Sequence, residues 1–218
     1  MKKLLHGIVH FRENVRPEYR KTFAHLALEQ KPDTLMVACS DSRVVPNLFA
    51  SSDPGDMFVV RNVGNLIPPC EDGSPHSEQA AIEFALKVLP VTDVIVCGHS
   101  ECGAVRALLD GPPSGTGPGL RSWLDFGKPA LAPLKAALSK TKLPPHNCLS
   151  QLNVLEQIEH LRTYPAVRER EQQGKLRLHA WWFDIAEAQV LSYDEASKSF
   201  LVLDEKRVKE LLRELEEG

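Results

Sequence analysis

Several features that would place this chain in a specialised class of protein are missing from its sequence. No apolar run is long enough to cross a bilayer, and 26 Lys and Arg against 29 Asp and Glu leave no basic excess for a nucleic-acid partner. Five cysteines, an odd number, do not make a disulfide framework. At the N-terminus, His6, Gly7 and His10 interrupt the apolar residues too early for a signal peptide. We therefore expect a cytoplasmic protein without a nucleic-acid or membrane partner.

The composition that remains is that of an ordinary globular protein. Apolar residues make up 43% and charged residues 25% of the 218 residues, which fits one domain with a sizeable core. Three nearly all-apolar runs, residues 34–39, 57–60 and 93–98, are typical of buried parallel strands. A helical pattern over residues 77–89 lies between the second and third runs, as in a crossover unit. We expect an α/β fold with a central, mostly parallel β-sheet flanked by helices.

The rest of the pattern completes this single predicted domain, residues 1–218. Its three expected parts are an N-terminal helical arm (1–32), an α/β core (33–204) and a C-terminal helix (205–218). Further helical stretches are expected at about 121–139 and 150–163, and further strands at 176–185, 189–193 and 200–203. The arm carries more apolar surface than a free surface helix should, so we expect it to pack on a partner subunit. Packing on its own subunit stays open.

Two polar segments come directly at the ends of two predicted strands. Residues 39–43 read CSDSR, and residues 98–103 read GHSECG. The carboxyl ends of parallel strands share one edge of a sheet, where ligands collect, so Cys39, His99 and Cys102 should lie close together. Two thiolates and one imidazole are a known catalytic zinc ligand set that leaves the fourth metal position open.

Asp41 and Arg43 lie in the first of these segments, two residues apart. The planar fork of an arginine side chain holds a carboxylate in one orientation. Asp41 could therefore pair with Arg43 and leave the fourth metal position to water, or it could bind the metal itself. The spacing does not decide between these two states.

Other roles for these residues stay open on spacing alone. Each cysteine could be a small buried apolar side chain, and His99 only a hydrogen-bond partner. A cysteine-dependent phosphatase would use Cys39 as its nucleophile and Arg43 to bind phosphate, but its loop would be short and Cys102 would have no role. The other three cysteines are expected to be structural: Cys97 inside a strand, and Cys70 and Cys148 in loops flanked by proline.

The two motifs together resemble the paired signature of the β-class carbonic anhydrases, in their plant-like and cyanobacterial-like branch. The resemblance runs from about residue 5 to residue 204 and includes GDMFVVRNVGNLIPP (55–69), NVLEQIEHLRTYPAVRE (153–169) and LHAWWFDI near the C-terminus. It implies reversible hydration of carbon dioxide to bicarbonate and a proton, one zinc ion per chain, and a homodimer or larger homo-oligomer.

The family's functional residues can be carried over position by position. Cys39, His99 and Cys102 match its zinc ligands, and Asp41 and Arg43 match its catalytic dyad. The resemblance then implies attack by a zinc-bound hydroxide that the dyad orients. Two rival functions stay open: a hydrolase of carbon disulfide or carbonyl sulfide on the same scaffold, and a non-catalytic zinc-stabilised scaffold, for which the dyad would have no use.

The substrate side of the site is implied in the same way. Gln30 matches a substrate-contacting glutamine, Phe58 an apolar pocket wall, and Gly103 the backbone beside the pocket. Phe84 stands where this branch commonly has a tyrosine, so one hydroxyl hydrogen bond near the pocket is in doubt.

A second departure concerns an inhibitory bicarbonate site that some family members have. That site resembles a Trp, Arg and Tyr trio, and the corresponding residues here are Met36, Arg61 and Phe183. We expect this chain to lack the inhibitory site and to keep Asp41 paired with Arg43.

Overall fold

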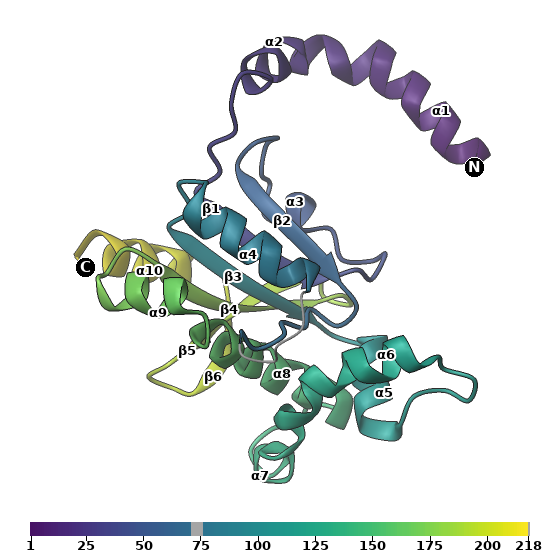
Figure 1. Cartoon of the computed structure of the whole chain (residues 1–218), viewed down its shortest axis with the longest axis vertical. Helices are drawn as coiled ribbons and strands as arrows, with labels where there is room; N and C mark the ends of the chain where they lie inside the picture. The colour runs from purple at the N-terminus through teal and green to yellow at the C-terminus, as the bar shows by residue number, and fades with distance from the viewer. Residues whose placement is uncertain (71–75, 218) are drawn as a thin grey trace.

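The computed structural model of the chain describes residues 1–70 and 76–217, so Gly218 of the predicted C-terminal helix lies outside the described residues. A sheet forms the centre of the fold (Figure 1). Its strands are β1 (Thr34–Cys39), β2 (Met57–Asn62), β3 (Asp93–His99), β4 (Arg177–Asp184), β5 (Gln189–Asp194) and β6 (Ser199–Val202). In space they follow the order β2-β1-β3-β4-β5-β6. The first four strands are parallel and the last two antiparallel, which confirms the predicted mostly parallel sheet.

The apolar character of β1 follows from its place inside the sheet. It has a parallel neighbour on each side, and every residue from Leu35 to Cys39 is buried. On one face, helices α4 (Ser77–Lys87), α8 (Pro145–Arg162) and α9 (Pro165–Gln172) pack against the sheet in the largest apolar cluster. Burial on both faces is what produces an all-apolar strand rather than an alternating one.

The helices beyond β3 depart from the sequence prediction. Residues 121–139 do not form one helix but belong to α6 (Pro118–Leu124), a 3-10 segment (Asp125–Leu131) and α7 (Leu134–Leu138). Pro129 and Pro133 lack the backbone N–H that a continuous helix needs, so the helix breaks there. Helix α8 begins earlier than expected, with Pro145 in its first turn, and Cys148 lies buried in this helix rather than in a loop. Two further helices are α5 (Gly103–Asp110) and α10 (Glu205–Glu217).

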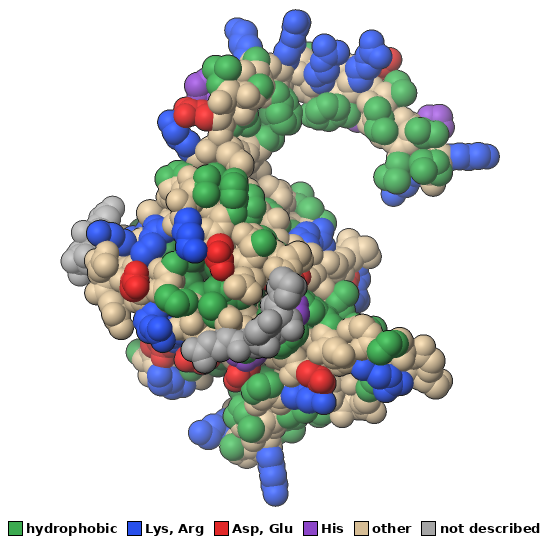
Figure 2. Space-filling model, viewed as in Figure 1, with side chains coloured by type: hydrophobic (Ala, Val, Ile, Leu, Met, Phe, Trp, Pro, Cys, Tyr) green, Lys and Arg blue, Asp and Glu red, His purple; other side chains and the backbone are tan. Residues whose placement is uncertain are grey.

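The N-terminal arm extends away from the sheet (Figure 1). It consists of α1 (Lys2–His10), a π-helical segment (Phe11–Val15) and α2 (Arg16–Leu26), and none of these elements buries a residue. Pro17 cannot donate a backbone hydrogen bond, which accounts for the irregular turn just before it. Figure 2 shows apolar side chains along the inner side of the arm and Lys and Arg along its outer side. Within the described residues, no helix has the length and apolarity to span a membrane.

Candidate metal centre

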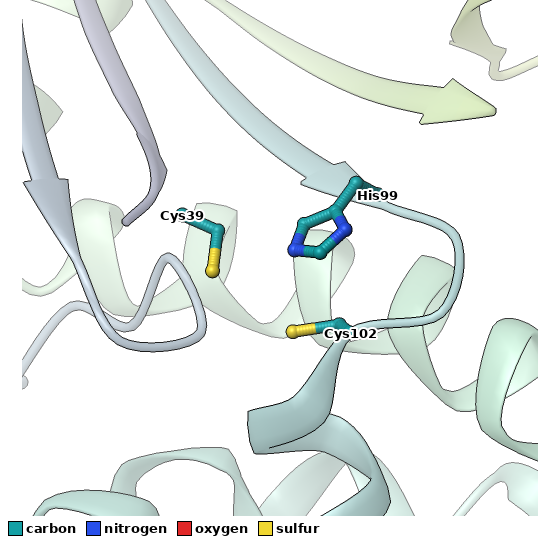
Figure 3. Close-up of side chains that lie close together, drawn as sticks. All are labelled: Cys39, His99 and Cys102. Atoms are coloured by element: carbon teal, nitrogen blue, oxygen red, sulfur yellow. The ribbon is translucent and has the colours of Figure 1, made fainter. Parts of the chain in front are cut away.

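The three predicted metal ligands lie together at the carboxyl edge of the sheet (Figure 3). Cys39 ends β1, His99 ends β3, and Cys102 immediately precedes α5. Their ligand atoms all lie within 4.8 Å of one another, and the residues are only 5%, 0% and 2% exposed. In residues 1–70 and 76–217, this is the only cluster of His, Cys, Asp or Glu side chains that could hold a metal ion.

The hydrogen bonds of His99 leave one ring nitrogen available to a metal. Nδ1 lies 2.8 Å from the carbonyl oxygen of Ser100, and since a carbonyl only accepts, Nδ1 carries the proton and donates. Nε2 is buried, and within the described part of the chain it has no hydrogen-bond partner. A neutral imidazole held through one nitrogen, with a lone pair on the other, is the usual state of a zinc-binding histidine. The donor set therefore fits zinc.

The two thiols of the cluster influence each other's ionisation. The hydrogen bond with the Cys102 side chain lowers the pKa of Cys39, and the Gly64 N–H points at its Sγ atom at 3.4 Å. The same hydrogen bond, together with burial, raises the pKa of Cys102. A cation bound by both sulfur atoms would displace their protons, so both cysteines would then be thiolates. Cys97 differs, because burial raises the pKa of its thiol to about 12, as befits the core residue expected there.

Asp41 and Arg43 form a two-pronged ion pair beside the cluster. Arg43 Nε donates to Asp41 Oδ1 at 3.0 Å and Nη2 donates to Oδ2 at 2.8 Å, while the Arg43 backbone N–H also donates to Oδ1 at 3.0 Å. The Arg43 hydrogen bond holds the pKa of Asp41 well below its usual range. Asp41 is therefore an ionised carboxylate in a fixed orientation, and it can only accept hydrogen bonds.

Arg61 fixes the backbone that carries both Cys39 and Asp41. Its guanidinium donates to the carbonyl oxygens of Cys39, Asp41 and Val44 at distances between 2.7 and 3.1 Å. These hydrogen bonds give Arg61 a structural role, because its guanidinium holds the backbone of residues 39–44 in place. The two other positions compared with the inhibitory bicarbonate site are apolar: Met36 is fully buried, and Phe183 stacks on Phe49 with ring centroids 4.8 Å apart.

Comparison with known proteins identifies the family. The family model described as carbonic anhydrase matches residues 34–190. A carbonic anhydrase of Pseudomonas aeruginosa is 37% identical over 205 residues, which cover 94% of this chain and 93% of the relative. One from Synechococcus elongatus is 39% identical over 94% of this chain and 76% of the relative. A solved structure of the β-carbonic anhydrase CcaA gives a TM-score of 0.87 at 37% identity, covering 94% of this chain and 92% of that chain.

This chain belongs to the β-carbonic anhydrase family. The resemblance seen in the two motifs is thus confirmed, and the chain is an enzyme of a zinc-dependent family. The general reaction of that family is the hydration of carbon dioxide, and the Cys-His-Cys cluster is consistent with zinc binding.

Of the residues expected to line the substrate pocket of a β-carbonic anhydrase, only one lies beside the metal cluster within this chain. Gly103 follows Cys102 and starts α5, so it lies at the site. Phe58 instead pairs with Leu35, four residues before Cys39 along β1, which corresponds to roughly 13 Å along the strand. Phe84 packs against Phe58 with ring centroids 5.8 Å apart. One chain therefore does not bring these two aromatic rings to the metal ligands.

Gln30 is also remote from the cluster within one chain. It is exposed and lies between α2 and the first residue of β1, at the opposite end of that strand from Cys39. Gln30, Phe58 and Phe84 thus share the amino-end side of β1 and β2.

Sequence reasoning missed the residues of α8 that support the ligand loop. Ser150 Oγ donates to the His99 carbonyl oxygen at 2.7 Å and accepts from Trp182 Nε1 at 3.0 Å. Asn147, one turn earlier, bonds to Glu101. Both polar side chains lie in the first turns of a buried helix, which is the one signal in the sequence that could have drawn attention to them.

Proposed function

We propose that this chain catalyses the reversible hydration of carbon dioxide, with one zinc ion held by Cys39 Sγ, His99 Nε2 and Cys102 Sγ. One observation carries the proposal: three buried ligand atoms within 4.8 Å of one another lie beside a carboxylate locked by an arginine. When bound, zinc supplies the Lewis acidity that makes water a nucleophile near neutral pH.

Asp41 acts as the hydrogen-bond acceptor that orients the attacking water. Because its carboxylate is ionised and accepts only, it can take a hydrogen bond from the water and aim the remaining lone pair at the substrate carbon. Arg43 holds Asp41 in this state through both oxygens. The two thiolates make the site less electropositive than a three-histidine site, so activity should rise toward alkaline pH.

The apolar arm supports a second proposal, that the functional unit is a homodimer. Leu4, Leu5, Ile8 and Val9 of α1 are each more than half exposed, and contiguous exposed apolar surface marks an interaction site. A second copy would cover this surface. It would also allow Gln30 and Phe58 to reach the partner's zinc site, which they do not reach in their own chain.

The test is stopped-flow hydration of carbon dioxide against pH, with zinc counted in the same sample. We expect about one zinc per chain and activity that rises with pH. Asp41→Asn should keep the zinc and lose about 100-fold or more in rate, whereas Asp125→Asn, an exposed aspartate paired with Lys128, should match wild type. Full zinc occupancy without hydration at any pH would contradict the proposal and direct the search to carbon disulfide and carbonyl sulfide.

Two features predicted from the sequence stay predictions. These are the division into an arm (1–32), a core (33–204) and a C-terminal helix (205–218), and the cytoplasmic location.

A further inference from the structure

Glu101 occupies an unusual backbone conformation between two zinc ligands. It separates His99 from Cys102, and its φ angle is +59°, in the left-handed region that glycine adopts most easily. A side chain in this region is strained unless surrounding contacts hold it. The shape of the loop that carries two of the three ligands therefore depends on whatever stabilises Glu101.

The side chain of Asn147 holds Glu101 at both ends. Asn147 Oδ1 accepts from the Glu101 backbone N–H at 2.8 Å, and Asn147 Nδ2 donates to Glu101 Oε1 at 3.2 Å. Asn147 is only 7% exposed, in the first turn of α8. One amide group thus bonds to the backbone and the side chain of the same strained residue.

Other partners of the Glu101 carboxylate are less protected from water. Arg106 forms an ion pair with it, and His146 Nε2 lies 2.9 Å from Oε1. The Glu101 and Arg106 side chains are 42% and 46% exposed, and ion pairs of this exposure contribute little to stability. His146 is better protected, at 15% side-chain exposure, but of these three side chains only Asn147 also bonds to the Glu101 backbone N–H, so the Asn147 amide is the one that holds the backbone conformation directly.

The same residue connects to the dyad. The carbonyl oxygen of Glu101 accepts from Arg43 Nη2 at 3.1 Å, and this nitrogen also donates to Asp41 Oδ2 at 2.8 Å. A change in the backbone at Glu101 would move Cys102 on one side and the guanidinium of Arg43 on the other.

We propose that Asn147 is a positioning residue for this site: by holding Glu101 in the left-handed conformation, it sets the geometry of His99 and Cys102 and aligns Arg43 with Asp41. The inference rests on the proposed function, since it concerns the same zinc site. Its test uses zinc retention, which requires no turnover, so the failure of one proposal can be told from the failure of the other.

The test compares Asn147→Ala, Glu101→Gly and the double variant. Asn147→Ala should release zinc to a chelator about tenfold faster than wild type and lower kcat with little change in KM. Glycine adopts the left-handed conformation without support, so Glu101→Gly should restore zinc release in the double variant to within about threefold of wild type. The visible absorption spectrum of the cobalt(II)-substituted protein should shift in Asn147→Ala and return in the double variant. Gln151→Ala, on the same helix, should behave as wild type.

Two outcomes would overturn the proposal. One is wild-type zinc release in Asn147→Ala. The other is a double variant that loses zinc as fast as Asn147→Ala, which would make Asn147 a general support of α8. If Asn147→Ala does not fold, the double variant is compared with wild type alone. The double variant should then fold and hold zinc, because Glu101→Gly removes the need for Asn147. A double variant that also fails to fold contradicts the proposal.

Discussion

The carboxyl edge of the sheet and the N-terminal arm are built in opposite ways. At the edge, Cys39, His99 and Cys102 are at most 5% exposed, and hydrogen bonds hold the loops that carry them. Along the arm, neither helix buries a single residue, and apolar side chains line its inner side (Figure 2). The cluster that could hold the metal is thus formed within one chain, whereas the apolar side chains of the arm are not covered by the chain itself.

This difference separates residues whose place in the site is set by their own chain from residues that their own chain leaves remote from the site. Contacts within the chain bring Cys39, His99 and Cys102 together, among them the pairing of the strands and the hydrogen bonds made by Arg61 and by Ser150 of α8. Gln30, Phe58 and Phe84, which were expected beside the substrate, lie apart from the cluster within one chain. Changes at the edge should therefore affect zinc, and changes in the arm should affect activity without affecting zinc.

The largest effect is expected from removing one ligand at the edge. Cys102→Ser should lose stoichiometric zinc and fall to background hydration, because two remaining ligands do not make the catalytic set. Zinc content by atomic emission and stopped-flow rates measure this. Cys148→Ala, a change to another buried cysteine outside the cluster, should keep its zinc. Full zinc in Cys102→Ser would show that the ligand set is wrong.

The next largest effect should come from the arm. Ile8→Glu puts a charge on the apolar side of α1, where Ile8 is 64% exposed. The dissociation constant of the dimer should rise at least about 30-fold, and activity should fall with it while zinc content stays constant. Light scattering and zinc analysis test this, with Thr22→Glu, an exposed polar position on α2, as the control. A wild-type chain that is monomeric and fully active would contradict the prediction.

A smaller effect is expected at the opposite, amino end of the sheet, where Asp93 bonds Arg177 and His179. Burial opposes its ionisation, but these hydrogen bonds hold the pKa of Asp93 below its usual range. Its stabilising contribution is therefore present above the unfolded pKa of about 3.9 and is lost as the pH falls below that value.

Asp93→Asn should accordingly lower Tm at pH 7 by about 3–6 °C, with zinc content and activity per folded chain unchanged. The difference from wild type should shrink below pH 4 in thermal unfolding experiments. Asp110→Asn, at an exposed position, serves as the control. A Tm difference that grows as the pH falls would show that the sign is wrong.

The smallest effect is expected from Phe84→Tyr. Phe84 is 41% exposed, so water can already solvate a new hydroxyl there, and kcat/KM should change by less than about threefold. Steady-state kinetics measure it, with Phe200→Tyr as a matched substitution in another part of the fold. A change of tenfold or more, with the dimer intact, would mean that this position contacts substrate more directly than proposed.

The fold and the close approach of Cys39, His99 and Cys102 were predictable, because each strand and each polar segment has its own local signal. Buried parallel strands appear as apolar runs, and the rule that ligands collect at carboxyl ends joins Cys39 to His99 and Cys102. The interrupted helices near Pro129 were predicted less well, because the apolar pattern alone hides the missing hydrogen bonds of proline.

Two contacts of the site join residues that no spacing rule connects. Asn147 lies 46 residues from Glu101, and no spacing rule links a polar residue on a buried helix to a strained loop. The hydrogen bond from Arg61 to the carbonyl oxygen of Cys39 likewise joins residues 22 positions apart. Gln30 and Phe58 lie apart from the metal cluster within one chain, and the proposal that they act in a partner's site involves a second chain, which a single sequence cannot place.

The central claim is that one active site combines the metal cluster of one chain with Gln30 and Phe58 of its partner. The most direct test is complementation between two defective chains. One chain carries Cys39→Ala and the other Gln30→Ala with Phe58→Ala; they are co-expressed with different tags, and the mixed dimer is purified. If the two halves of a site come from different chains, one site of the mixed dimer contains only wild-type residues, so its hydration activity will exceed that of both parent dimers. A mixed dimer no more active than the average of its parents would show that Gln30 and Phe58 do not act across the interface.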